Sequence, residues 1–252
     1  MATVLDLQGL TKHFGGVRAV DGIDLAVTRG EIVGLIGPNG SGKSTIVNLI
    51  CGLLPPTAGR VVFNGADISR LPPHARVTLG IARTFQNIRL FGQLTVWQNL
   101  WVAQNSGEQR NQNFLRRWFG GSNGAWEEIN RTLEFFDLAH KRDELAANLA
   151  FGEQRRLEFA RALAAKPVLL LLDEPAAGMN AEEVDQLDSR IRKLRQDGIT
   201  VLLIEHHVEL VMSVADRVAV LNFGQKIAEG TPAFVQADPA VREAYLGTAA
   251  VA

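Results

Sequence analysis

The sequence predicts an α/β fold with a mostly parallel sheet, an antiparallel β portion at the N-terminal end and an inserted all-helical subdomain. Short apolar runs such as residues 168–172 have the length of buried strands, and they alternate with segments of helical spacing. The first part of the chain shows several strand patterns in succession, one of them with period-two alternation. A long middle stretch shows helical spacing with no convincing strand between the helices.

The N-terminal part predicts strands around one glycine-rich turn. The turn covers residues 37–42 and leads into a predicted helix over residues 43–53. The Pro and Gly content of residues 54–59 predicts a loop. The predicted strand that follows this loop ends at a turn formed by Asn64 and Gly65. The predicted strands are residues 4–7, 23–27, 31–36 and 60–64.

The middle of the chain predicts the helical insertion. Residues 105–124 are polar, contain Gly and are basic in patches, so we expect a surface excursion there. The predicted helices are residues 94–104, 125–138 and 153–165. We therefore expect a helical subdomain over residues 87–165, inserted into an α/β core made of residues 1–86 and 166–252.

The C-terminal part returns to alternating strands and helices. A helix over residues 181–196 ends near Gly198, a suitable residue to terminate a helix. Gly224 marks the turn of a predicted hairpin. The predicted strands are residues 168–172, 199–204, 217–222 and 225–229, and the second predicted helix covers residues 206–214.

Composition limits the class of protein. A chain of 252 residues that is 46% hydrophobic suffices for an α/β core with an inserted subdomain. Lys and Arg number 26 against 27 Asp and Glu, so the charge balance gives no sign of a nucleic-acid binder. The single cysteine, Cys51, excludes an intramolecular disulfide and fits a reducing compartment.

Membrane insertion is not predicted. No stretch approaches the roughly 20 apolar residues that span a bilayer, and residues 1–4 do not begin a secretory signal. We therefore expect a soluble, intracellular chain whose link to any membrane runs through a partner.

Residues 37–44 match the phosphate-binding pattern G-x-x-x-x-G-K-[ST] between a predicted strand and a predicted helix. Glycines let successive N–H groups point inward toward an anion, and the helix adds its positive end. Lys43 should reach the β- and γ-phosphates, and the Ser44 hydroxyl should coordinate Mg²⁺. A chance match in a chain of this length is on the order of one in a hundred. The nucleotide-binding residues expected from this motif are Asn39, Gly40, Ser41, Gly42, Lys43, Ser44 and Thr45.

A second motif places two carboxylates at the end of a buried strand. Residues 168–172 are followed directly by Asp173 and Glu174, at the strand end where open α/β sheets place their ligands. Asp173 should hold Mg²⁺ through its water shell, and Glu174 should activate or orient the attacking water. The alternative is an ordinary strand end with solvated acids, which the phosphate loop disfavours. The phosphate loop alone leaves kinases, GTPases, helicases and transporters possible, and the two carboxylates narrow that set.

An ordered series of motifs over nearly the whole chain resembles the nucleotide-binding subunits of ABC transporters. Residues 83–86 resemble the Q-loop of that family, and residues 149–155 lie where it has its LSGGQ-type signature. Residues 175–180 take the D-loop position, and residues 201–206 end in what resembles the switch histidine. Each piece alone is weak, but the shared order is specific.

The resemblance implies roles for five further residues. Phe14 would stack on adenine, with Val20 completing that surface. Gln86 would touch Mg²⁺ or the attacking water and transmit nucleotide state to a membrane partner. His206 would contact the γ-phosphate. Gly152 would face the γ-phosphate held by a second subunit, so that two ATP molecules are sandwiched in a head-to-tail dimer. The alternatives are core packing for Phe14 and a surface or capping role for His206.

The resemblance can be narrowed to one group within this family. Five segments look most like the branched-chain amino acid importers, and more like their LivG-type than their LivF-type subunit. They are residues 84–91, 94–96, 155–158, 176–180 and 244–247. The resemblance implies membrane permease subunits, a second ATP-binding subunit, homo- or heteromeric, and an extracytoplasmic receptor as an indirect partner. It also implies a peripheral position on the cytoplasmic face of the membrane. Related importers move urea, short amides or aromatic acids.

Several residues depart from the family pattern, and other functions stay open. Ala150 replaces a frequent serine, Phe151 and Glu153 stand where Tyr and Gln are common, and Asn180 and His207 stand where Asp is common. A non-transport ABC ATPase usually carries two nucleotide domains, zinc modules or coiled coils, and none is evident. A nucleotide sensor without hydrolysis is disfavoured by Glu174, and a P-loop kinase is a distant alternative.

Overall fold

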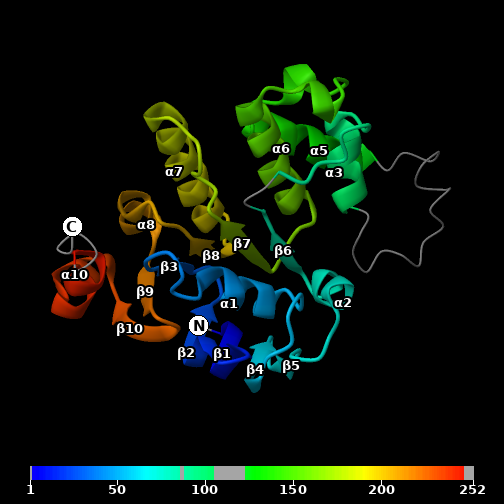
Figure 1. The fold of residues 1–252 in the computed structure, drawn as a ribbon. Coiled ribbons are helices and arrows are strands. Elements are labelled where there is room, and N and C mark those ends of the chain that lie inside the picture. The colour runs from blue at the N-terminus through cyan, green and yellow to red at the C-terminus, as the bar shows by residue number, and fades with distance from the viewer. Residues whose placement is uncertain (1, 86–87, 105–122, 247–252) are drawn as a thin grey trace. The chain divides into compact units, whose positions relative to one another are not determined.

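The computed structural model describes residues 2–85, 88–104 and 123–246, and it divides into two compact units (Figure 1). The first unit consists of Met1–Arg76 together with Leu171–Ala252, and the second of Val77–Leu170. The predicted surface excursion over residues 105–124 lies almost entirely outside the described residues.

An antiparallel sheet begins the first unit. Strands β1 and β2 pair along nearly their whole length and are joined by a tight turn at Gly15 and Gly16. Both are longer than the segments that sequence patterning predicts, because irregularities in their register interrupt the alternation. The sheet has the order β2-β1-β4-β5, made of β1 (Thr3–Phe14), β2 (Val17–Thr28), β4 (Ala58–Phe63) and β5 (Ala66–Asp67).

The second sheet is the mostly parallel one that the sequence predicts. Its order is β10-β9-β3-β8-β7-β6, β3 runs parallel to β8 and β9, and β10 runs antiparallel to β9. The central strands β3, β7 and β8 are buried at every position, as their apolar sequences require. The strands are β3 (Ile32–Ile36), β6 (Ile81–Arg83), β7 (Leu169–Asp173), β8 (Thr200–Ile204), β9 (Arg217–Asn222) and β10 (Gln225–Gly230).

The helices of the first unit cover these strands. Helix α1 follows β3 directly, α8 packs on β3, and α7 packs on β8 and α8. Helices α2, α9 and α10 are short and were not predicted. The bounds are α1 (Lys43–Ile50), α2 (Pro73–Thr78), α7 (Ala181–Gln196), α8 (Val208–Val214), α9 (Pro232–Ala237) and α10 (Pro239–Leu246).

In the described residues of the second unit, the regular elements besides β6 and the start of β7 are helices. Helices α3 (Val96–Gln104) and α5 (Asn123–Phe135) both pack on α6 (Phe151–Ala164). Two 3₁₀ turns, Ala139–Lys141 and Ala146–Asn148, connect α5 to α6. No helix within the described residues is long and apolar enough to cross a membrane.

Candidate nucleotide-binding site

The phosphate loop joins β3 to α1, and two of its glycines have no room for a side chain. Gly42 has φ +105°, and a Cβ built on it would lie 2.4 Å from the carbonyl oxygen of Ala19. A Cβ on Gly37 would lie 2.2 Å from the carbonyl oxygen of Leu221. The loop therefore packs against β2 on one side and β9 on the other, which fixes the position of its N–H groups.

Lys43 begins α1 and is 6% exposed. Its Nζ donates hydrogen bonds to the carbonyl oxygens of Gly37 at 2.6 Å and Pro38 at 3.0 Å. Burial lowers the pKa of Lys43, against the attraction of the Glu174 and Asp173 carboxylates, which raises it. The positive charge of the loop and the two acids at the end of β7 thus act on one another across one site.

Glu174 follows β7 with an uncommon backbone conformation. Its φ is +49°, in the left-handed region that a non-glycine residue seldom adopts. A hydrogen bond of 2.8 Å from its N–H to the carbonyl oxygen of Ile204 holds it there. Such strain persists only where neighbouring structure enforces it, and it is frequent at functional sites. Asp173, the last residue of β7, is 4% exposed.

His206 follows β8, the neighbour of β7, and therefore lies beside Glu174. Its Nδ1 lies 3.8 Å from Glu174 Oε2, and its side chain is 57% exposed. The structure thus brings together Lys43, Asp173, Glu174 and His206, four residues that the sequence predicts for one site. Glu205, the residue before His206, is fully buried among them and was not predicted.

The expected adenine-binding residues differ in exposure. Phe14 ends β1 and is 47% exposed, with Lys12 Nζ 5.2 Å from the centroid of its ring. Val20 is fully buried, so its side chain packs in the core behind Gly42. Of the remaining loop residues, Asn39, Gly40 and Ser44 are exposed, Thr45 is half-buried and Ser41 is buried. Gln86 lies outside the described residues.

The signature segment lies in the second unit. Gly152 is the second residue of α6, and Ala150 is the residue that precedes the helix. Glu153 Oε2 accepts a hydrogen bond from Ala150 N–H at 2.9 Å. The negative charge of Glu153 therefore serves the first turn of its own helix, where the helix dipole favours it. This explains how an acid is accommodated at a position where the family often has Gln.

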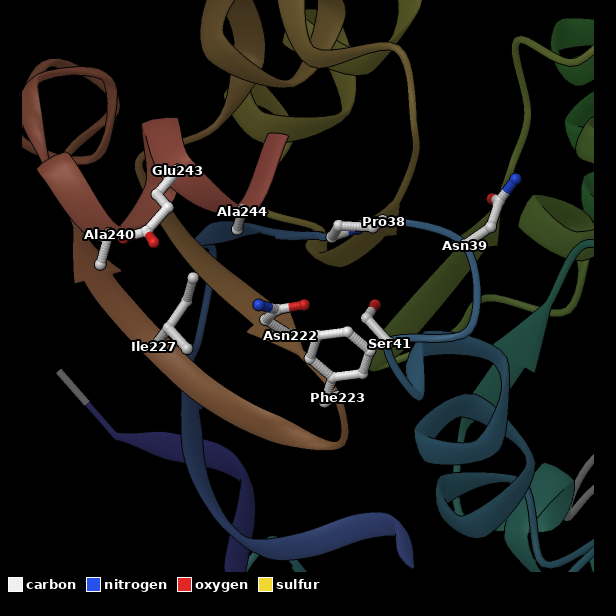
Figure 2. A pocket seen from close by; sticks show the side chains of 9 residues that line it. All are labelled: Pro38, Asn39, Ser41, Asn222, Phe223, Ile227, Ala240, Glu243 and Ala244. Atoms are coloured by element: carbon white, nitrogen blue, oxygen red, sulfur yellow. The ribbon is translucent and has the colours of Figure 1, made fainter. Parts of the chain in front are cut away.

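The C-terminal helix α10 lies beside the phosphate loop. Figure 2 shows Glu243 and Ala244 of α10 across a cavity of about 590 Å³ from Pro38, with Phe223 of the β9–β10 turn at one side. Tyr245 is close enough to the backbone of Gly37 for that backbone to influence its phenol. Burial raises the pKa of Tyr245 to about 12, against the smaller lowering effect of Gly37. Of the residues that line this cavity, Asn39 and Ser41 were predicted for the site.

A metal ion at this site would need ligands from the nucleotide and from water in addition to those of the protein. Among the described residues, no group of three or more His, Cys, Asp or Glu side chains could hold a metal by itself. The donors at hand are the Ser44 hydroxyl and the Asp173 carboxylate, both oxygen atoms, as Mg²⁺ prefers. This set fits an ion that completes its shell with water and substrate phosphates.

Fold and site together define a nucleotide-binding P-loop protein, and comparison with known proteins identifies the family. Residues 20–177 match the family model described as "ABC transporter", and residues 225–251 match that described as "Branched-chain amino acid ATP-binding cassette transporter". The chain belongs to the ATP-binding subunits of ABC transporters, and it is an ATPase of that family. The predicted resemblance and fold class are therefore confirmed.

Several relatives cover almost the whole chain. The "High-affinity branched-chain amino acid transport ATP-binding protein BraF" of Pseudomonas aeruginosa is 44% identical over 253 residues, 98% of each chain. LivG of Escherichia coli, of the same description, is 41% identical with the same coverage. The lipopolysaccharide export system ATP-binding protein LptB of Escherichia coli is 38% identical, again over 98% of each chain.

Solved structures share the fold. The ADP conformation of MJ1267, an ATP-binding cassette of an ABC transporter, matches with a TM-score of 0.83 and 34% identity. The match covers 98% of this chain and 100% of that one. A nucleotide-free ATP-binding cassette matches with a TM-score of 0.82, also at 34% identity.

Proposed function

We propose that this chain hydrolyses Mg·ATP at the Lys43–Glu174 site to power import of branched-chain or related amino acids. The observation that carries the hydrolytic part is the convergence of Lys43, Asp173, Glu174 and His206, which come from three separate segments of the chain. A nucleotide sensor without hydrolysis would have no need of an acid and a histidine held 3.8 Å apart.

The phosphate loop binds the triphosphate. Its N–H groups form the anion nest, and Lys43 exchanges its carbonyl partners Gly37 and Pro38 for the β- and γ-phosphate oxygens. Ser44 and Asp173 would hold Mg²⁺, and the ion would neutralise charge on the phosphates. Phe14, half-exposed at the end of β1, stacks on the adenine. Val20 supports that surface from the core.

Glu174 and His206 act on the attacking water. Glu174 accepts a proton from the water or orients it, and its 17% exposure keeps it partly solvated. His206 donates to the γ-phosphate and, next to Glu174, limits where the water can stand. Gln86 contributes to Mg²⁺ or water binding and signals nucleotide state to the membrane partner.

A second ATP-binding subunit completes the site. Gly152 at the start of α6 offers its N–H and the positive helix end to a γ-phosphate bound by the partner. Each subunit then provides one phosphate loop and one signature segment. The partner is a second copy of this chain or a related subunit.

The proposed solute rests on two similarities. BraF and LivG, described as branched-chain amino acid transport proteins, are 44% and 41% identical, and residues 225–251 match a model of that type. LptB, described as part of lipopolysaccharide export, is 38% identical, so a nucleotide-binding subunit alone does not fix what is transported. Permease subunits hold the chain peripherally at the cytoplasmic face, and an extracytoplasmic receptor delivers the solute to them. Urea, short amides and aromatic acids are the alternative solutes.

The hydrolytic role is tested with Glu174→Gln. The variant should bind ATP with parent affinity, lose turnover and persist as an ATP-dependent dimer, measured by nucleotide titration, phosphate release and size-exclusion chromatography. Glu182→Gln, an exposed acid on α7, is the matched control and should hydrolyse ATP at the parent rate. Parent-rate hydrolysis by Glu174→Gln would contradict the mechanism.

The solute is tested in proteoliposomes that contain the chain with its permease and partner subunits. ATP-driven uptake of labelled leucine, competed by isoleucine and valine, is expected. Uptake of urea or an aromatic acid with no leucine uptake would replace the proposed solute and leave the ATPase role intact.

A further inference from the structure

Glu205 is a buried carboxylate to which the proposed function gives no role. It follows the wholly buried strand β8 and has 0% exposure. Placing a carboxylate among apolar side chains is costly unless hydrogen bonds satisfy its oxygens. Both oxygens of Glu205 are satisfied, and every donor is a backbone N–H near the nucleotide site.

The two oxygens hold two different segments. Oε1 accepts a hydrogen bond at 2.7 Å from the N–H of Ala176, two residues after Glu174. Oε2 accepts from the N–H groups of His206 at 3.0 Å and His207 at 3.1 Å. One side chain therefore connects the segment that follows the water-activating acid with the segment that carries the switch histidine.

The same oxygen also faces the histidine ring. Glu205 Oε2 lies 3.6 Å from His206 Nδ1, and Glu174 Oε2 lies 3.8 Å from the same nitrogen. Nδ1 therefore points toward two carboxylates, which leaves Nε2 as the nitrogen available to a phosphate. Because Glu205 is fully buried and its oxygens are occupied, it cannot itself reach substrate.

We propose that Glu205 is a positioning residue: it holds His206 and the segment after Glu174 in one fixed relation, so that the water-activating acid and the phosphate-binding histidine keep their spacing. This inference rests on the proposed roles of Glu174 and His206. Glu205 acts on turnover through geometry. Nucleotide affinity depends on the phosphate loop, and the donors to the Glu205 carboxylate lie outside that loop.

Glu205→Gln is the sharpest substitution. A carboxamide has one acceptor oxygen, so its NH₂ group must face either Ala176 N–H or the two histidine N–H groups, donor against donor. One of the two segments is then released whichever way the amide turns. Glu205→Asp keeps two acceptor oxygens on a shorter arm and is the conservative variant expected to restore part of the function.

The test measures kcat and the KM for ATP of the purified full chain. Because a misplacement of about 1 Å in a catalytic group can cost about 100-fold, Glu205→Gln should lower kcat by about 10- to 100-fold. The KM for ATP should stay within about twofold, since interactions made only in the transition state change kcat alone. Glu205→Asp should retain more turnover than Glu205→Gln.

One further variant separates positioning from stability. Leu203→Ala, a buried residue of the same strand, should lower Tm at least as much and leave kcat near the parent value at a temperature well below Tm.

Two results would overturn the proposal: parent kcat in Glu205→Gln, or an equal loss of kcat in Leu203→Ala. Failure of the underlying function looks different. Parent-rate hydrolysis by His206→Ala would remove the histidine's proposed role and, with it, the basis of this inference.

Discussion

The Oε1 atom of Glu158 accepts hydrogen bonds from two backbone N–H groups, that of Phe85 at 3.4 Å and that of Arg89 at 3.2 Å. Glu158 belongs to α6 and is 2% exposed, and the two donors lie on either side of residues 86–88. Arg155, one turn earlier, donates to the carbonyl oxygen of Phe85 at 3.2 Å. Helix α6 thus holds the backbone at Phe85 and at Arg89.

Two substitutions of Glu158 should separate the loss of its charge from the loss of its hydrogen-bond acceptor. Glu158→Gln keeps an acceptor oxygen for both donors, so we expect a loss of at most about 1 kcal/mol in the free energy of unfolding. Glu158→Leu leaves both N–H groups without that acceptor and should cost about 2–4 kcal/mol, at about 1–3 kcal/mol for each buried unsatisfied group. Urea unfolding at neutral pH measures both. Equal stability of the Leu variant and the parent would show that water replaces the carboxylate.

Arg76 should be essential for the stability of the first unit. It is 1% exposed, and its guanidinium donates to four backbone carbonyl oxygens, including those of Leu49 and Ile50 in the last turn of α1. Arg76→Met leaves these acceptors unsatisfied, so we expect a loss of about 3 kcal/mol or more in the free energy of unfolding. Guanidinium titration followed by circular dichroism measures it. Arg70→Ala, an exposed arginine nearby, is the control and should change stability by less than about 0.5 kcal/mol.

Tyr245 is the only tyrosine of the chain, so its ionisation can be followed directly by absorbance near 295 nm. The folded protein should titrate with a midpoint of about 12, because burial raises the pKa of Tyr245 from its ordinary value of 10.0. The denatured protein in urea should titrate near 10.

This shift has a consequence for stability. Since the folded-state pKa is raised, the contribution of neutral Tyr245 is present below pH 10 and is lost as the pH rises toward 12. Tyr245→Phe should therefore lack both the absorbance change and this part of the stability loss. A folded-state midpoint near 10 in the parent would mean that α10 does not bury the phenol against the phosphate loop.

Asn180 should be replaceable by Asp but not by Ala. It precedes α7, its Oδ1 accepts from Glu183 N–H at 3.0 Å, and Glu183 Oε2 accepts from Asn180 N–H at 2.9 Å. Because Asp serves equally well as an N-cap, Asn180→Asp should change stability by less than about 0.5 kcal/mol, whereas Asn180→Ala should cost about 1 kcal/mol. The free energies of unfolding of both variants and the parent, measured by thermal unfolding, test this prediction. A large loss in the Asp variant would indicate that the amide group has a further partner.

The strands and the phosphate loop could be predicted because their signals are local. Apolar runs of strand length predicted β3, β7 and β8. The spacing of the two motifs predicted Lys43, Asp173 and Glu174 as site residues. Helix α2 and strand β6 were missed because six and three residues are too few to show a period.

Other features of the two units depend on contacts between residues that are distant in the sequence. Glu158 and Phe85 are 73 positions apart, and Glu205 and Ala176 are 29 apart, so neither hydrogen bond leaves a pattern along the chain. The one available signal for Glu205 and Glu158 was an acidic residue in an otherwise apolar, buried segment. A buried carboxylate needs hydrogen-bond donors, but the sequence does not show which ones. Asn180 and Glu153 looked like departures from the family, yet each provides a hydrogen bond at the start of its own helix.

The left-handed backbone of Glu174 bears on how this enzyme would respond to selection for heat resistance. Exchange to glycine would relieve a conformational cost of about 1 kcal/mol or more at that position, while removing the carboxylate to which we assign the activation of water. A library of variants screened only for stability to heating would therefore enrich glycine at position 174, and these variants would be stable but inactive. Screens that aim at a more robust transporter must score uptake and thermal tolerance together.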